Sequence, residues 1–327
     1  MNEPKLRNDL ATFAYWHIKS GDIDPVYPVL DTLHSILCDD DEEALRFTLL
    51  YVTYYNLPSA MGAWSRGVFT QAGRLPELSI AKYATGTERR AHRMPQKLIE
   101  HLDYLDGIAA NYGSLTAWLT HDLTDNHEHN WRLLQDRLRT VRHNGRWAAY
   151  KTGEILATVH KYPLKPTDAG HDFSSGPRKG LADCYPESAG ITGFKPDAVN
   201  ALNKLTRDLQ EFLYYNVASY EIPIEQVETI LCDWHSLLKG GYYVGHDIDV
   251  MLEQANKGLR AGVLQEDDYH ELMFAREQAF NHKWLGEYND WDGVRKNLKT
   301  LYRETGEVKW WELSETKVRR RPRRVTK

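Results

Sequence analysis

The chain has 327 residues, of which 42% are hydrophobic and 11% aromatic, enough apolar surface to build one or two folded cores. No stretch approaches the roughly 18 consecutive apolar residues of a membrane span, and the first residues lack the basic-then-apolar pattern of a signal peptide. We therefore expect a cytoplasmic protein without a membrane segment. The three cysteines form no C-x-x-C pair, which excludes a ribbon-type zinc site and a four-thiolate iron–sulfur cluster within the chain.

The formal charge of −5 is unevenly distributed, because residues 317–327 hold seven basic side chains and no acid. Without those seven residues the formal charge becomes −12. We expect residues 316–327 to form a disordered basic tail and residues 1–315 to form the folded catalytic region. An acidic body argues against a broad nucleic-acid surface, so binding to phosphates would depend on local groups of Lys and Arg.

Apolar residues recur at three- and four-residue spacing along most of the chain, and clean two-residue alternation is missing. This pattern predicts an all-α fold built from amphipathic helices. The predicted helices are Glu42–Tyr55, Pro95–Ala110, Ser114–Leu123, Asn130–Arg142, Arg146–His160, Asp197–Val217, Ile224–Leu238, Asp247–Leu259, Asp267–Leu285 and Gly293–Thr305.

Two stretches lack a helical pattern. Residues 160–196 are rich in Pro, Gly, Ser and Asp and are long for a loop, so they mark a possible cleft between two helical lobes. Residues 62–94 are loop-like and carry a basic cluster, in which Arg89, Arg90 and Arg93 are candidate DNA contacts. An exposed helix face is the alternative explanation of that cluster.

Residues 141–151 read as the end of one helix, a tight turn at Gly145 and the start of another helix. Free backbone N–H groups at such a helix start, together with Arg146 and Lys151, predict a phosphate-binding turn. The turn resembles the hairpin of helix–hairpin–helix DNA glycosylases, although only one glycine of that motif is present. An ordinary glycine-containing corner between helices is the alternative.

Asp168 follows Gly145 by 23 residues. In helix–hairpin–helix glycosylases an aspartate at about this offset faces the sugar of a flipped nucleotide, so the resemblance makes Asp168 a candidate catalytic acid. Asp172 competes for the role. The alternative for either residue is a turn-forming aspartate that accepts a hydrogen bond from its own backbone.

Small and flexible residues flank two adjacent cations, Arg178 and Lys179, in the segment 174–181. Backbone N–H groups in such a loop, with the two cations, predict a site for a phosphate or pyrophosphate. The segment is not a Walker loop, and a solvated loop is the alternative.

Glu228, Cys232 and His235 share one face of a predicted helix. We interpret Cys232 as a buried structural thiol and retain Glu228 as a catalytic candidate. The histidines and aspartates at 121–129 are typical of a surface turn, so no metal or other cofactor is expected.

The segment 240–249 combines a Gly-Gly turn with two aromatic residues and a helix start. Tyr242 and Tyr243 are candidates for stacking on a base, and Asp247 is a plausible N-cap. His246 and Asp249 are separated by three residues, so they point the same way and are further catalytic candidates.

Several of these segments together resemble one bacteriophage family, the amino acid:DNA transferases, also called α-glutamyl/putrescinyl thymine pyrophosphorylases. The resemblance covers most of the chain and implies a fold related to helix–hairpin–helix DNA glycosylases. The segments that carry it are Leu49–Ala60, Thr87–Arg93, Gly145–Lys151, Ser175–Leu181, Glu228–Trp234 and Gly241–Asp249.

The resemblance implies a reaction on DNA. A phosphorylated or pyrophosphorylated 5-hydroxymethyluracil in the DNA would lose its leaving group to a free amino acid or polyamine. Such a step needs cations for the leaving group and a base for the incoming amine, so we expect Asp168, Arg178, Lys179, His246 and Asp249 to converge on one pocket. The alternatives are a DNA N-glycosylase that uses Asp168 and a non-catalytic DNA-binding phage protein.

Overall fold

The computed structural model describes residues 3–69, 83–86, 94–218, 221–281, 285 and 298–308. Within these ranges the regular structure is entirely helical, which confirms the predicted all-α class. The α-helices are α1 (Glu3–Ser20), α2 (Val26–Leu37), α3 (Asp41–Tyr54), α4 (Leu57–Ser65), α6 (Pro95–Tyr112), α7 (Leu115–Thr120), α8 (His127–Arg139), α9 (Arg146–Thr158), α10 (Gly176–Cys184), α11 (Pro196–Leu213), α12 (Ile224–Leu238), α13 (His246–Arg260), α14 (Glu266–Ala279) and α16 (Leu301–Thr305), with a 3₁₀ helix at Pro186–Gly190 and a π-helical turn at Tyr214–Ala218.

Side-chain caps fix where several of these helices begin. Asp40 accepts a hydrogen bond from the backbone N–H of Glu43 at the start of α3, and Asn56 accepts one from Ser59 at the start of α4. Ser114 and Asn126 cap α7 and α8 in the same way. The described part of the chain contains no helix long and apolar enough to cross a membrane.

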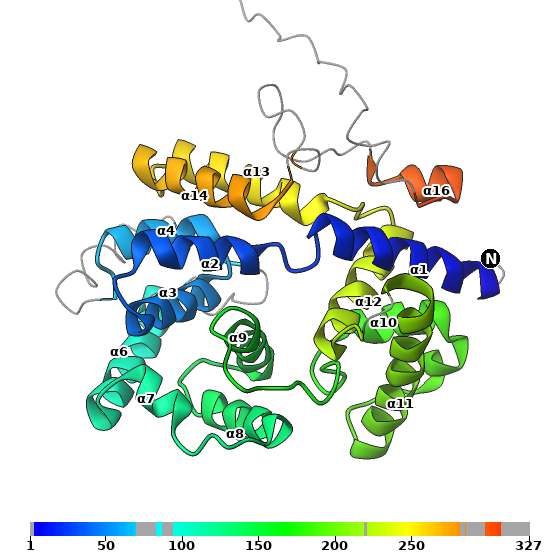
Figure 1. The fold of residues 1–327 in the computed structure, drawn as a ribbon, viewed down its shortest axis with the longest axis horizontal. Helices are drawn as coiled ribbons and strands as arrows, with labels where there is room; N and C mark the ends of the chain where they lie inside the picture. The colour runs from blue at the N-terminus through cyan, green and yellow to red at the C-terminus, as the bar shows by residue number, and fades with distance from the viewer. Residues whose placement is uncertain are drawn as a thin grey trace, which may run out of the picture.

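The helices pack around two separate hydrophobic cores. The first core is formed by α2–α4, α6–α9, α13 and α14, which occupy the left and upper parts of Figure 1. The second core is formed by α1, α10–α12 and α16, on the right of Figure 1. The N-terminal helix thus packs with helices from the C-terminal half, and the chain changes core after α1, after α9, near the start of α13 and between α14 and α16.

The predicted long loop at residues 160–196 is wrong in its second half, because α10 and a 3₁₀ helix lie there. The glycines of α10 explain why the sequence pattern did not predict this helix, and they also explain how it packs. A Cβ atom on Gly180 would lie 2.0 Å from the carbonyl oxygen of Leu231, and one on Gly176 would lie 2.5 Å from Sγ of Cys232. These glycines let α10 approach α12 closely, and most of the segment 174–181 is therefore helix and not loop.

Gly145 lies in the turn between α8 and α9, as predicted, and is the N-cap residue of α9. Its φ of −77° and the open space around its Cα do not require glycine. The helix ranges 41–54, 95–112 and 224–238 agree with the prediction within about two residues at each end. The predicted helix at Gly293–Thr305 is described only from residue 298.

Candidate functional site

Titratable side chains from both cores meet where α9 faces α12 (Figure 1). We call one part of this region the lysine cluster: Lys151 and Glu154 of α9, Glu228 of α12 and Asp24 from the connection between α1 and α2. Nζ of Lys151 lies 2.7 Å from Oε2 of Glu154, 3.6 Å from Oε2 of Glu228 and 3.7 Å from Oδ1 of Asp24. The hydroxyl of Tyr27 donates a hydrogen bond of 2.9 Å to the same oxygen of Glu154.

Burial controls the protonation of this cluster. Burial alone would lower the pKa of Lys151, but Asp24 and Glu154 raise it well above its ordinary value, so the ammonium stays charged. Burial raises the pKa of Glu154 well above its usual range and also raises that of Glu228, although Lys151 opposes both shifts. The cluster therefore places a charged lysine beside two carboxyl groups whose affinity for protons is increased.

The carboxylate of Asp22 caps the N-terminus of α13. Its Oδ1 accepts hydrogen bonds of 3.0 Å from the backbone N–H groups of both Asp247 and Ile248, and its Oδ2 accepts from the N–H of Gly245 at 2.6 Å. Tyr242 donates its hydroxyl to the same Oδ2 at 2.7 Å. The prediction that Asp247 is the N-cap is therefore wrong. Gly245 is the N-cap residue of α13, and Asp22, from the N-terminal part of the chain, supplies the acceptor.

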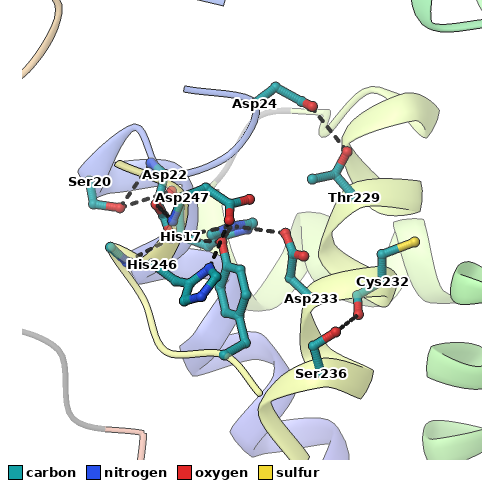
Figure 2. A network of polar contacts seen from close by, with 12 residues as sticks. His17, Ser20, Asp22, Asp24, Thr229, Cys232, Asp233, Ser236, His246 and Asp247 are labelled. Atoms are coloured by element: carbon teal, nitrogen blue, oxygen red, sulfur yellow. Dashed lines mark hydrogen bonds and ion pairs between the residues drawn. The ribbon is translucent and has the colours of Figure 1, made fainter. Parts of the chain in front are cut away.

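Next to Asp22 lies a second group, the Asp233 network, drawn in Figure 2. Nε2 of His17 lies 3.0 Å from the hydroxyl oxygen of Tyr242 and 3.4 Å from Oδ2 of Asp233. His246 hydrogen-bonds to Asp247 through Nδ1 at 2.8 Å, and its ring centroid lies 4.9 Å from that of Tyr242. Asp24 of the lysine cluster accepts a hydrogen bond from Thr229 on α12, the helix that also carries Asp233 (Figure 2).

Burial again dominates the electrostatics of the network. It lowers the pKa of His17 to about 4, so the imidazole is neutral at pH 7. Burial and the charge of Asp247 raise the pKa of Asp22 to about 7, against the effect of its hydrogen bonds. Burial and the nearby acids Asp247 and Asp22 raise the pKa of Asp233 well above its usual range.

A comparison with protein families agrees with the resemblance in the sequence. The family model described as amino acid:DNA transferase matches residues 18–243, more than half of the chain. The chain belongs to the amino acid:DNA transferase family. The matched range contains the lysine cluster, Asp22 and Asp233, whereas His246 and Asp249 lie beyond it.

The structure of this transferase brings some predicted site residues together. Lys151 and Glu228, predicted from separate motifs, lie in one buried cluster. Lys151 was predicted to bind phosphate, but carboxyl groups surround it, which disfavours an anion there.

The two tyrosines predicted to stack on a base are buried. Tyr242 uses its hydroxyl to bind Asp22, and Tyr243 donates a hydrogen bond to the fully buried Asp249. A base could stack on either ring only after the surrounding helices moved. His246 remains near the network, with an Nε2 atom that finds no hydrogen-bond partner among the described residues.

Other predicted residues have contacts elsewhere. Asp168 accepts a hydrogen bond of 2.8 Å from the N–H of Gly170, the turn-forming role given above as its alternative. Arg178 donates to the carbonyl oxygens of His171 and Gly193 at 2.6 and 2.7 Å and thereby braces the segments on either side of α10. Lys179 is exposed on α10. No contact among the described residues joins Asp168 or Arg178 to His246.

The candidate DNA-binding residues are only partly described. Gly145 and Arg146 are exposed at the start of α9, and Arg146 forms an ion pair of 3.1 Å with Asp172. Arg89, Arg90 and Arg93 lie outside the described residues, as does the basic tail at residues 316–327.

Sequence reasoning missed Asp22, Asp24, Glu154, Asp233 and His17. Asp22 and Asp24 flank Ile23 in a short connection and match no motif, while Glu154 and Asp233 resemble the polar positions of ordinary amphipathic helices. His17, Asp22 and Glu154 are distinguished only by their full burial, and Asp24 and Asp233 only by their contacts. Within the described ranges, no three His, Cys, Asp or Glu side chains are placed to hold a metal ion.

Proposed function

We propose that this transferase joins the amino group of a free amino acid or polyamine to a phosphorylated or pyrophosphorylated 5-hydroxymethyluracil in DNA. The amine nitrogen attacks the exocyclic methylene carbon, the carbon–oxygen bond breaks, and its electron pair leaves with the phosphate or pyrophosphate. The nitrogen then loses a proton. The reaction takes place in the cytoplasm of a phage-infected cell and uses no cofactor.

The observation that carries this proposal is the junction between the two cores, within a chain that belongs to the transferase family. There, α9, α12 and the connection after α1 supply buried acids whose pKa values are raised by burial. An amine substrate arrives as an ammonium ion, and the reaction needs groups that first bind this cation and then take its protons. Ionised carboxylates at the junction would bind the cation, and the increased proton affinity of these buried acids favours the second step.

DNA would approach from the hairpin between α8 and α9. In this proposal the exposed N-terminus of α9 at Gly145 and the side chain of Arg146 contact a phosphate of the DNA backbone, as the resemblance to helix–hairpin–helix glycosylases implies. Lys151 and Glu154 lie further along the same helix. Contact at the hairpin would therefore bring the DNA to the helix that carries half of the lysine cluster.

Nucleoside mass spectrometry tests this function. Duplex DNA that contains 5-hydroxymethyluracil is first pyrophosphorylated and then incubated with the protein and glycine, serine, glutamate or putrescine. We expect a nucleoside whose mass equals thymidine plus the amine, less two hydrogens, together with release of pyrophosphate. Release of a free base would instead support the glycosylase alternative, and unchanged DNA that remains bound would support the non-catalytic one.

A further inference from the structure

Asp233 differs from the other acids at the junction in its hydrogen bonding and in the exposure of its side chain. No described residue donates a hydrogen bond to its Oδ2, although that atom is buried. The side chain as a whole retains 16% of its exposure, whereas those of Asp22 and Glu154 are fully buried. Asp233 thus has a buried oxygen without a donor on a side chain that is partly exposed.

The groups facing Asp233 come from every element around it. Asp22 and Asp24 face it from the connection after α1, Glu228 from α12 and Asp247 from α13, and each of these acids disfavours a second negative charge there. His17 of α1 is the neighbouring nitrogen base, and it is neutral. Lys151, the nearest cation with a described contact to one of these acids, is 3.6 Å from Glu228 and is already surrounded by three carboxyl groups. The position around Asp233 therefore favours an incoming cation, such as an ammonium ion.

His17 has one tautomer that satisfies its contacts. The hydroxyl of Tyr242 donates its hydrogen to Asp22, so its oxygen is left to accept from Nε2 of His17. His17 therefore carries its hydrogen on Nε2, on the side of Asp233, while its Nδ1 has no partner among the described residues. A neutral imidazole 3.4 Å from Oδ2 of Asp233 limits the position of that carboxyl group by contact, without neutralising its charge.

We infer that Asp233 is a catalytic residue that receives the proton of the incoming amine, and that His17 is a positioning residue for Asp233; this inference rests on the proposed transfer reaction. The ammonium form of the amine first passes one N–H proton to a carboxylate oxygen of Asp233. The neutral nitrogen then attacks the carbon, the carbon–oxygen bond breaks, and the nitrogen loses its second proton to water. The bonding electrons of the N–H bond stay on nitrogen. The protonated Asp233 returns its proton to water after the product leaves.

Placing the carboxyl group of Asp233 among other acids lowers the stability of the folded protein, as is common for catalytic groups. Replacing it with Asn keeps the shape of the side chain and removes a carboxyl group that four acids surround. We expect the Asp233→Asn protein to fold with a melting temperature equal to or higher than that of the wild type. A purely structural aspartate would instead lower the melting temperature when replaced.

The test compares amines that do and do not carry a removable charge. Pyrophosphorylated 5-hydroxymethyluracil DNA is incubated under single-turnover conditions with the wild type, Asp233→Asn, or Asp208→Asn, which removes an exposed aspartate of α11 as a matched control. Putrescine and glycine are the protonated probes, and hydroxylamine, which is uncharged at neutral pH, is the third. A His17→Gln protein is measured from pH 6 to 9 with the better of the first two probes.

We expect Asp233→Asn to slow transfer of the protonated amine by about 10²-fold or more at pH 7, the usual scale for a lost general base. The loss should shrink to less than about tenfold with hydroxylamine, and the rate of the variant should rise with pH as free amine accumulates. His17→Gln should change the pH dependence of the rate while Asp233 remains present.

The inference would be overturned if Asp233→Asn lost the same fraction of its transfer rate with all three amines and its rate did not rise with pH. It would also be overturned if Asp233→Asn transferred the amines at the wild-type rate. An unchanged pH profile in His17→Gln would remove its positioning role. A wild-type protein that makes no adduct with any amine overturns the proposed transfer reaction itself. Transfer by the wild type combined with normal transfer by Asp233→Asn overturns only the assignment of Asp233.

Discussion

Nζ of Lys151 on α9 lies 3.6 Å from Oε2 of Glu228 on α12, and this buried ion pair connects the two hydrophobic cores. The side chain of each residue is less than 10% exposed. Taking a lysine out of water is unfavourable unless acids surround it, and Glu154 and Asp24 complete that surrounding. The relative placement of the cores and the protonation of the candidate site therefore depend on the same four side chains.

Replacing Lys151 with Met should destabilise the protein by about 3–5 kcal/mol, because it leaves the acids around it without a counter-charge. Chemical unfolding measures the change. Lys204→Met, at an exposed position of α11, is the matched control and should have little effect. Adding Glu154→Gln to Lys151→Met should recover part of the loss, and simple additivity of the two changes would show that they do not interact.

Asp22→Ala should also destabilise strongly. It removes the acceptor of the N–H groups of Gly245, Asp247 and Ile248 and leaves them buried without a partner, at a cost of about 1–3 kcal/mol for each fully buried group. Differential scanning calorimetry should show a large fall in melting temperature. Asp39→Ala, at an exposed aspartate before α3, should leave the melting temperature within a degree or two; a comparable fall there would refute the special role of Asp22.

Two glycines with opposite surroundings provide a paired test of the fold. Gly180→Ala places a methyl group against the carbonyl of Leu231 and should separate α10 from α12, with a loss of about 1–3 kcal/mol or more. Gly145→Ala meets no atom within 4 Å at an ordinary φ, so its stability should be unchanged. If Gly145 approaches a DNA phosphate closely, the same variant should weaken DNA binding in a salt-dependent titration.

A pair of histidines should make the protein sensitive to acid. Thr48 forms hydrogen bonds with Nε2 of both His34 and His160, at 3.1 and 2.9 Å, and joins α2, α3 and the end of α9. Burial lowers the pKa of His34 to about 3 and that of His160 to about 4. The unfolded chain binds these protons near pH 6.5, so the stabilisation is complete above that pH and is lost as the pH falls from 6.5 towards 4.

His160→Gln should therefore reduce the fall in melting temperature between pH 7 and pH 5. The wild type and the variant are compared in the same buffers by calorimetry. His129→Gln, at an exposed histidine of α8, serves as the control. An identical pH dependence in wild type and His160→Gln would show that the pair does not govern acid sensitivity.

Periodicity predicted the long helices because their apolar residues face a core on one side. The start of α12 at Ile224 and its end at Leu238 follow directly from the pattern. Helix α4 is apolar on almost every side because it is buried, so it has no amphipathic signal, and α10 was hidden by glycines that serve packing against α12. The first two helices, α1 and α2, were also missed, although α2 has a clear apolar face.

The site was less predictable than the fold. Lys151 stood out as a cation after the turn at Gly145 and Glu228 as a polar residue on an otherwise apolar helix, but the sequence contained no sign that α9 and α12 face each other. Asp22 and Asp233 act through contacts more than 200 residues apart along the chain, as with Tyr242 and His17. Such pairs depend on how the two cores are assembled, which local sequence patterns do not encode.

The central claim is that the junction of the two cores is where the amine is transferred to DNA. The most direct measurement is the rate of adduct formation by Glu228→Gln, followed by nucleoside mass spectrometry, against Glu211→Gln at an exposed position of α11. We predict a loss of about 10²-fold or more for Glu228→Gln with unchanged DNA affinity, and wild-type rates for the control. Full transfer activity in Glu228→Gln would contradict the assignment of this junction as the active site.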